Sequence, residues 1–162
     1  MRLSAFLLLL GVAGCSPSLP SDSEVIGTLR ANRADFEQAR DIVLGLERQY
    51  VRLDLEDPST LGALDAGERA LMERLRERTG ATVIQGGGRK GDERYVDFAL
   101  FRWGFAFGGA MKSVSWRDGT MEGRRVLPSL DDTSDRRGFV TDTWFNAMRP
   151  IGGGWWMEVS DD

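Results

Sequence analysis

The chain of 162 residues is predicted to fold as an α+β protein, with two N-terminal helices packed on an antiparallel sheet of about four to six strands. Apolar residues recur at intervals of three and four up to residue 79, and at every second position after residue 80. Each helical stretch begins with a capping-box pattern, which signals a helix N-terminus. Because the helices precede the strands and do not alternate with them, the order argues against a doubly wound parallel sheet.

The first predicted helix spans residues 22–53 and starts after the capping-box pair Ser21 and Glu24. Asn32 is the one polar position on its apolar face, and the pattern allows a break near Asn32 or Gly45. The apolar positions are Val25, Leu29, Phe36, Ala39, Val43, Leu46, Tyr50 and Leu53. We interpret this face as packing on the protein's own sheet. The alternative is a seam for a partner helix, although sustained coiled-coil heptads are missing.

The second predicted helix spans residues 65–79, with Asp65 and Glu68 as its capping box. Gly80 follows it and can adopt the positive φ of a helix C-terminus. The sheet is predicted to occupy residues 81–160. Its expected strands are a short one at 81–85, a central one at 94–103, another at 110–117 and a C-terminal hairpin at 144–159, with an exposed loop at 128–138.

The composition narrows the chemistry that the chain can perform. It contains no histidine and a single cysteine, which excludes catalytic imidazoles, histidine-ligated metals, internal disulfides and Cys-x-x-Cys sites. The 21 basic residues are outnumbered by 25 acidic ones, and the formal net charge is −4. This balance argues against nucleic-acid binding, which favours a basic surface. No cofactor is expected.

The first 15 residues have the pattern of an export signal. Arg2 precedes an apolar run at residues 3–10, which is about half of the roughly 20 residues that a membrane-spanning helix needs. The segment Val12-Ala13-Gly14-Cys15 then gives an aliphatic residue, two small residues and a cysteine. This region closely resembles the signal peptide and lipobox of bacterial lipoprotein precursors. The remaining chain is similar only in layout to small bacterial lipoproteins with no assigned activity.

The resemblance implies that the thiol of Cys15 is acylated, with fatty acids such as palmitate, and that residues 1–14 are removed as a signal peptide. Residues 15–21 would form a lipidated, Pro- and Ser-rich tether, and residues 22–162 a single domain. Because Ser16 and not Asp follows the cysteine, the resemblance implies the outer membrane, with the domain facing the periplasm. The partners would be the lipid bilayer and an envelope protein or peptidoglycan.

Two motifs receive structural interpretations. Residues 86–91 fit the G-x-G-x-x-G spacing of nucleotide sites, but Asp92 and Glu93 follow where a phosphate site needs a helix N-terminus. We interpret this segment as a flexible hairpin loop. The acidic run at residues 131–135 lacks the ligand spacing of a calcium loop and precedes two arginines, so we interpret it as a solvated loop and predict no metal site.

The tryptophans offer candidate ligand contacts. All five lie in the second half of the chain. Trp155 and Trp156 are adjacent and must point to opposite faces of a regular strand, so at least one of them is a candidate for exposure. An exposed ring there would stack on a sugar or a peptide. The alternative is that both rings fill the core.

Asp97 is the one candidate for acid–base chemistry, because it lies within an otherwise apolar strand face. With Glu93, Asp92 or Glu158 it would form the carboxylate pair of a glycosidase-like hydrolase. The alternative is a structural role, in which Asp97 accepts a hydrogen bond or pairs with a basic residue, either Arg102 or Lys112.

The sequence therefore favours a membrane-anchored, periplasm-facing lipoprotein with a non-enzymatic binding or structural role in the cell envelope. The alternatives are a carboxylate-dependent cell-wall hydrolase and an oligomeric scaffold that acts through residues 25–53. Two carboxyl groups roughly 5–10 Å apart in a cleft would favour the hydrolase. A flat sheet with an exposed tryptophan would favour the binding protein, and an unburied apolar helix stripe would favour the scaffold.

Overall fold

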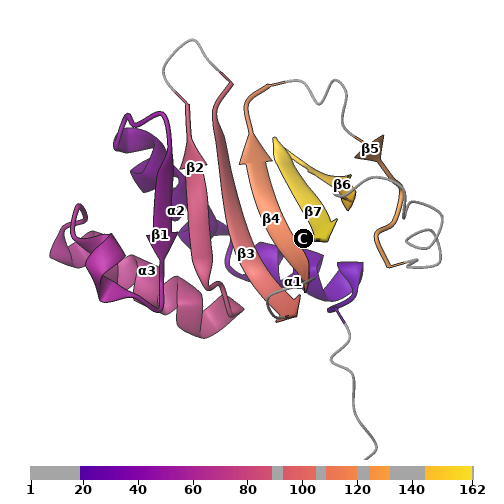
Figure 1. Ribbon diagram of the computed structural model, residues 1–162, viewed down its shortest axis with the longest axis horizontal. Coiled ribbons are helices and arrows are strands. Elements are labelled where there is room, and N and C mark those ends of the chain that lie inside the picture. Colours follow the sequence, from indigo (N-terminus) through magenta and orange to yellow (C-terminus); the bar gives the residue numbers. More distant parts are fainter. Residues whose placement is uncertain (1–18, 89–92, 105–108, 120–124, 132–144, 162) are drawn as a thin grey trace, which may run out of the picture.

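The computed structural model describes residues 19–88, 93–104, 109–119, 125–131 and 145–161. In these residues the strands form one mixed sheet in the order β1-β2-β3-β4-β7-β6-β5 (Figure 1). The helices are α1 (Asp22–Ala31), α2 (Arg33–Gly45) and α3 (Ala66–Thr79), with a short 3-10 helix η1 (Pro58–Leu61). The strands are β1 (Val51–Asp54), β2 (Val83–Gly87), β3 (Tyr95–Gly104), β4 (Gly109–Arg117), β5 (Arg125–Val126), β6 (Phe145–Gly152) and β7 (Trp155–Asp161).

The predicted architecture of two N-terminal helices on four to six antiparallel strands is wrong. The described chain has three α-helices and a seven-stranded sheet, and β5 pairs with β6 in parallel. Residues 22–53, predicted as one helix, form two helices and the strand β1. In β1 the buried residues Val51 and Leu53 alternate with the exposed Arg52. The apolar positions of this segment are compatible with both helical and strand spacing. The segment is a strand because it pairs with β2.

The local signals at the helix ends are confirmed. The helix pattern breaks at Asn32, which separates α1 from α2, and α2 ends at Gly45. The capping boxes before α1 and α3 both form, and Gly80 ends α3 with a φ of 73°. These features depend on hydrogen bonds between residues close in sequence, which is why their residue types are informative.

One core holds the helices against the sheet. Phe36 of α2 packs edge-on against Phe98 of β3 and Trp155 of β7, with ring centroids 5.0 and 6.0 Å away. Of the residues predicted as an apolar stripe, Leu46 is partly buried and Tyr50 is 53% exposed, and the others are buried in this core: Val25, Leu29, Phe36, Ala39, Val43 and Leu53. Leu71, Met72 and Leu75 of α3 are buried in the same core. Most of the stripe that an oligomeric scaffold would need is therefore packed in the protein's own core, and Tyr50 is its exposed member.

The glycines of the G-x-G-x-x-G segment serve close backbone packing. Gly86 and Gly87 belong to β2 and not to the predicted loop, while residues 89–92 lie outside the described residues. A Cβ at Gly86 would lie 2.5 Å from the carbonyl oxygen of Tyr95, and one at Gly87 would lie 2.3 Å from that of Gln49. A side chain cannot fit at either position. The element that follows is the strand β3, as expected, and not the helix that a phosphate site requires.

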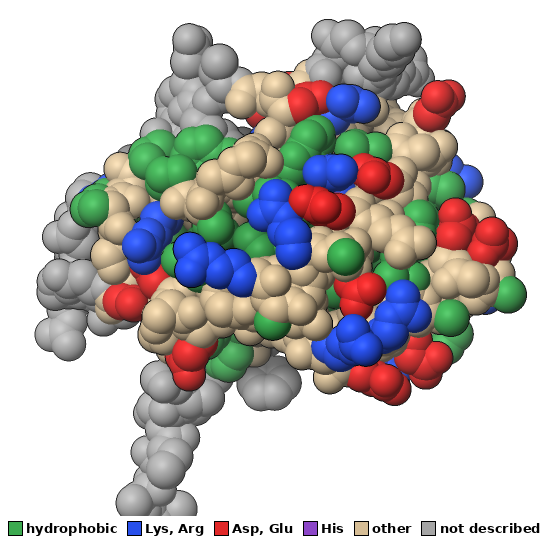
Figure 2. Space-filling view, turned by 180° about the vertical axis from the view of Figure 1, so that it is seen from behind, with side chains coloured by type: hydrophobic (Ala, Val, Ile, Leu, Met, Phe, Trp, Pro, Cys, Tyr) green, Lys and Arg blue, Asp and Glu red, His purple; other side chains and the backbone are tan. Residues whose placement is uncertain are grey.

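Charged side chains of both signs lie close together on the face shown in Figure 2. On α2, Arg33 pairs with Glu37 at 2.6 Å and Arg40 pairs with its neighbour Asp41 at 2.7 Å. Exposed pairs of this kind contribute about 0–1 kcal/mol each to stability. Among the described helices, none is long and apolar enough to cross a membrane.

The end of α2 provides a test of backbone strain. Glu47 is the only described residue other than glycine with a positive φ, 49°, and its side chain is exposed. A left-handed conformation costs about 1–2 kcal/mol for a residue with a Cβ. Replacing Glu47 by glycine is expected to raise the free energy of unfolding by about 0.5–1 kcal/mol in urea denaturation, because part of the gain is offset by the entropy of the unfolded chain.

The matched control is Arg48→Gly, at the next exposed position, which has no positive φ. That change is expected to lower the free energy of unfolding, since it adds only unfolded-state entropy. An equal loss of stability in both variants would show that the conformation of Glu47 carries no strain.

Candidate functional site

The sheet has a second face, opposite the helices. Side chains alternate between the two faces of a strand. On β3, Phe98 packs toward the helices, so its neighbour Asp97 points to the other face. On β4, Trp116 packs toward the helices, so its neighbour Arg117 points to the same face as Asp97. All three α-helices contribute side chains to the core on the first face. We call the second face the open face of the sheet, since no described helix contributes to a core on it.

Three charged side chains meet at the centre of the open face. Arg117 of β4 places Nη2 3.1 Å from Oδ1 of Asp97 on β3 and 3.3 Å from Oε2 of Glu158 on β7. Ser115, also on β4, places its Oγ 3.3 Å from the same oxygen of Glu158. The guanidinium of Arg117 also lies over the ring of Tyr95, 5.1 Å from its centroid. Asp97, Arg117 and Glu158, here called the triad, are each only 8% exposed.

The triad is incompletely satisfied. Both acids contact the same nitrogen of Arg117, and its buried Nε has no hydrogen-bond partner among the described residues. Burial raises the pKa of Asp97, the positive charge of Arg117 opposes that rise, and the negative charge of Glu158 adds to it. Hydrogen bonds from Ser115 and Gln85 act against the rise, yet the net pKa stays above its ordinary value. The ionised form of Asp97 is therefore disfavoured in the folded protein.

Two cavities lie over this part of the open face. The larger has a volume of about 390 Å³ and is lined by Gln85, Glu93, Tyr95, Asp97, Arg117 and Glu158. The smaller has a volume of about 170 Å³, shares Gln85 and Asp97 with the first, and extends toward Arg52 and Arg102. The triad thus forms part of the lining of a hollow on the surface.

The structure brings Asp97 together with two of its predicted acidic neighbours, Glu93 and Glu158, around the larger cavity. Asp92 lies outside the described residues. The basic partner of Asp97 is Arg117 and neither Arg102 nor Lys112, the two that the sequence proposed. The missed signal was strand register. In the antiparallel pairing of β3 with β4, Asp97 is opposite Ser115, which places Arg117 on the diagonal of the same face.

The two candidate tryptophans occupy different environments. Trp155 is 1% exposed and packs in the core beneath α2, with the guanidinium of Arg33 4.9 Å from its ring centroid. Trp156 is partly exposed and lies opposite Ser115 in the pairing of β4 with β7. A ligand on the open face would therefore meet Trp156. Cys15, the predicted lipidation site, lies outside the described residues.

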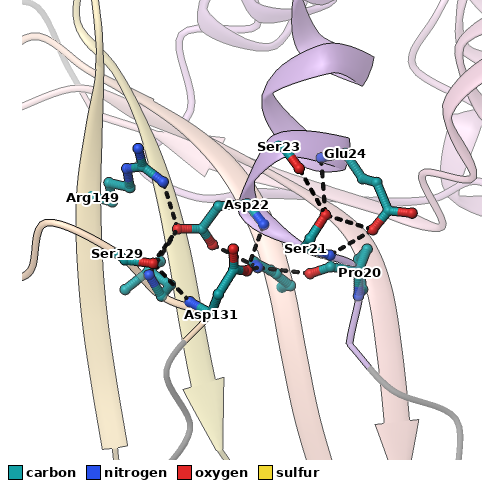
Figure 3. Close-up of polar contacts among 10 residues, drawn as sticks. Pro20, Ser21, Asp22, Ser23, Glu24, Ser129, Asp131 and Arg149 are labelled. Atoms are coloured by element: carbon teal, nitrogen blue, oxygen red, sulfur yellow. Dashed lines mark hydrogen bonds and ion pairs between the residues drawn. The ribbon is translucent and has the colours of Figure 1, made fainter.

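A second charged cluster, here called the lysine cluster, lies where the described chain begins (Figure 3). Lys112 of β4 is 1% exposed, and its Nζ lies 2.7 Å from Oδ1 of Asp22, 2.7 Å from the carbonyl oxygen of Pro20 and 3.3 Å from Oδ1 of Asp131. Asp131 also accepts a 2.6 Å hydrogen bond from the backbone N–H of Asp22. Of the acidic run predicted as a solvated loop, only Asp131 is described.

Asp22 is the central acid of the lysine cluster. Its Oδ2 accepts hydrogen bonds from Nη1 of Arg149 at 2.6 Å and from the backbone N–H of Leu130 at 2.8 Å. Burial alone would raise the pKa of Asp22, but the hydrogen bonds from Leu130, Lys112 and Arg149 outweigh it and lower the pKa to about 2. Leu19 packs against the core beside this cluster. Residues 19–21, assigned to the tether by the sequence, therefore contact the folded body.

Among the described residues, no group of three acids or cysteines is placed to hold a metal ion. The chain was also compared with protein-family models, with curated proteins and with solved structures. None of the three comparisons gives a match.

Proposed function

We propose that the protein is a lipid-anchored lipoprotein of the cell envelope that faces the periplasm and binds a ligand, without catalysis, through the open face of its sheet. The observation that carries the proposal is the buried triad beneath a cavity of about 390 Å³. Well-packed apolar residues are often as stable as a buried ion cluster. A cluster of buried charged side chains that borders a cavity and includes a carboxyl group with a raised pKa, Asp97, is accordingly a candidate for recognition.

The anchor is supported by the sequence and by where the fold begins. The lipobox ends at Cys15, and Leu19 already packs against the core. Only residues 16–18 remain between them. Since an extended residue spans about 3.3–3.6 Å, the domain would stay within roughly 15 Å of the acylated cysteine. Ser16 after the cysteine supports the outer membrane as the location, and the candidate partners are an envelope protein or peptidoglycan.

Binding is favoured over hydrolysis because of the position of Arg117. A glycosidase needs a carboxylic acid and a carboxylate on opposite sides of the bond that breaks, with space for substrate between them. Asp97 and Glu158 instead contact one nitrogen of Arg117, so the guanidinium occupies the space between the two carboxylates.

The binding role is tested by crosslinking in intact envelopes. A photoreactive benzoylphenylalanine in place of Trp156 is expected to give a discrete crosslinked product, because this position lies on the open face. Adding Asp97→Asn is expected to reduce that product at least tenfold. The pKa of Asp97 is higher in the folded protein than in the unfolded chain, so the protonated carboxyl is the form that suits the fold. Its stabilising contribution is complete below the unfolded-state pKa and is lost as the pH rises through the folded-state pKa. The amide is thus expected to keep or raise the melting temperature at pH 7.

The matched control is Glu37→Gln, which removes a carboxylate from the helix side of the molecule and is expected to leave the product unchanged. No product from the wild-type protein, or an equal yield with Asp97→Asn, would contradict binding through the triad. Release of cell-wall fragments by the purified protein would instead support the hydrolase.

A further inference from the structure

We propose that the smaller cavity on the open face binds the carboxylate end of a peptide whose last residue is small and apolar, such as alanine. This inference rests on the proposed binding function and adds the chemical class of the ligand. Three properties of the cavity lead to it. They are two arginines without ionic partners, a buried hydroxyl without a hydrogen bond, and apolar side chains in the remaining lining.

Two guanidinium groups line the smaller cavity, which has a volume of about 170 Å³. Arg52 comes from β1 and Arg102 from β3, and both are exposed. Neither arginine forms an ion pair or a hydrogen bond with another described residue. The acid in the same lining, Asp97, is already paired with Arg117. A guanidinium has a planar fork of N–H donors that matches the two oxygens of a carboxylate, so these donors favour an anionic ligand.

A β-bulge brings Arg102 to this cavity. Asp97 and Arg102 are five positions apart on β3, and a regular strand would place them on opposite faces of the sheet. The pairing of β3 with β4 shifts between Ala99 and Phe101, where β3 contains one extra residue. The shift restores Arg102 to the open face, opposite Met111, and both residues line the cavity. Bulges commonly redirect a side chain in this way next to functional sites.

The wall of the cavity contains a buried hydroxyl that has no partner. Ser113 of β4 is 1% exposed and lines the cavity. Its Oγ forms no hydrogen bond with any described residue, whereas Ser115 on the same strand contacts Glu158. A buried hydroxyl without a hydrogen bond is unfavourable. A carboxylate oxygen in the cavity would accept the proton of this hydroxyl and add a neutral donor to the two guanidinium groups.

The size and the remaining lining favour a small apolar group next to the anion. Val83, Ala99 and Met111 provide the apolar side chains of the lining. A volume of about 170 Å³ is below the roughly 300–1,000 Å³ of pockets that hold a whole ligand, so the cavity would take only the end of a larger molecule. It shares Gln85 and Asp97 with the cavity of about 390 Å³, where the preceding part of a peptide would lie. A terminal carboxylate on a residue with a methyl side chain meets these conditions together.

The experiment is a calorimetric or NMR titration of the full protein in detergent with three probes. N-acetyl-alanyl-alanine has the terminal carboxylate and the methyl group, its C-terminal amide lacks the negative charge, and inorganic phosphate lacks the apolar part. We expect N-acetyl-alanyl-alanine to bind, and each of the other two probes to bind at least tenfold more weakly. Binding of the amide as tight as that of the acid overturns the proposal. Equally tight binding of phosphate also overturns it, since the cavity would then be a general anion site.

Variants of the lining identify the groups that hold the carboxylate. Arg52→Gln and Arg102→Gln are each expected to weaken N-acetyl-alanyl-alanine binding at least fivefold and to leave the melting temperature unchanged, because neither arginine has a partner among the described residues. The matched control is Arg30→Gln on α1, which removes another exposed arginine without a described partner and is expected to have no effect. Ser113→Ala is expected to weaken binding at least threefold without lowering the melting temperature, since it removes no hydrogen bond within the described protein.

Unchanged affinity in the double variant Arg52→Gln with Arg102→Gln overturns the proposal. A loss of affinity in Arg30→Gln as large as that in Arg52→Gln does so too, because it would reflect only the overall charge of the protein. Should N-acetyl-alanyl-alanine fail to bind while the crosslink at position 156 still depends on Asp97, the binding function stands and only the ligand class is wrong.

Discussion

Cys15→Ser is expected to abolish acylation of the protein and to stop its maturation. The thiol of Cys15 is the only cysteine sulfur in the chain, so no other position can take over a thioether-linked lipid. Serine preserves the size of the side chain and the apolar run before it. The variant should therefore accumulate as a slower-migrating precursor without fatty acid, which gel mobility and mass spectrometry of the N-terminal peptide would detect.

The expected effect is all or none, because membrane attachment depends on the number of acyl chains. One chain gives marginal, reversible binding, whereas two or more give stable attachment. Ser18→Ala, which lies beyond the proposed lipobox and before the folded body, is the matched control and should mature normally. Unchanged mobility and unchanged membrane association of Cys15→Ser would show that residues 1–15 are an ordinary secretory signal or part of the fold.

Features that depend on neighbours in sequence were predictable, and those that depend on sheet pairing were not. The ends of α3 were recognised because Asp65, Glu68 and Gly80 act within one or two turns of the helix. β1 was missed because its alternation is only four residues long and also fits a helix. β5 has two residues and is defined by its parallel pairing with β6, for which no local pattern exists.

The same distinction applies to the candidate site. Asp97 was recognisable because a carboxylate interrupts an apolar strand face. Its neighbours Arg117 and Glu158 come from two other strands, and only the register of β3, β4 and β7 brings the three together. The lysine cluster was not anticipated at all, since Lys112 and its partner Asp22 are far apart in sequence and neither has an unusual local context. An ion pair between residues that are distant in sequence produces no local sequence pattern from which it could be predicted.

Asp22→Asn is expected to lower the free energy of unfolding by about 3–5 kcal/mol at pH 7, measured by urea denaturation with tryptophan fluorescence. The variant keeps the shape of the side chain but leaves Lys112, 1% exposed, without its closest counter-charge. Removal of one partner from a buried ion pair strands the other charge away from water, and that desolvation is the main cost. Asp131, the remaining acid at 3.3 Å, is half-exposed and replaces little of the lost interaction.

Lowering the pH should reduce the difference in the free energy of unfolding between Asp22→Asn and the wild-type protein. The pKa of Asp22 is about 2 in the folded protein against an ordinary value of 3.8, so its ionisation adds about 2 kcal/mol of stability above pH 3.8. This contribution decreases as the pH falls toward 2 and below, and the variant has none to lose. A difference that stays constant from pH 5 to pH 2 would mean that Asp22 does not titrate with this lowered pKa.

The double variant Asp22→Asn with Lys112→Met separates loss of charge from loss of packing. Methionine fills much of the space of the lysine stem and carries no charge, so the stranded cation disappears. Arg149, the other cation on Asp22, is partly exposed and can turn its guanidinium to water. The double variant should therefore be more stable than Asp22→Asn alone, although it has lost one more native contact. If it is instead less stable by the full cost of Lys112→Met, the two residues act independently and the buried charge is not what holds residues 20–22 against the sheet.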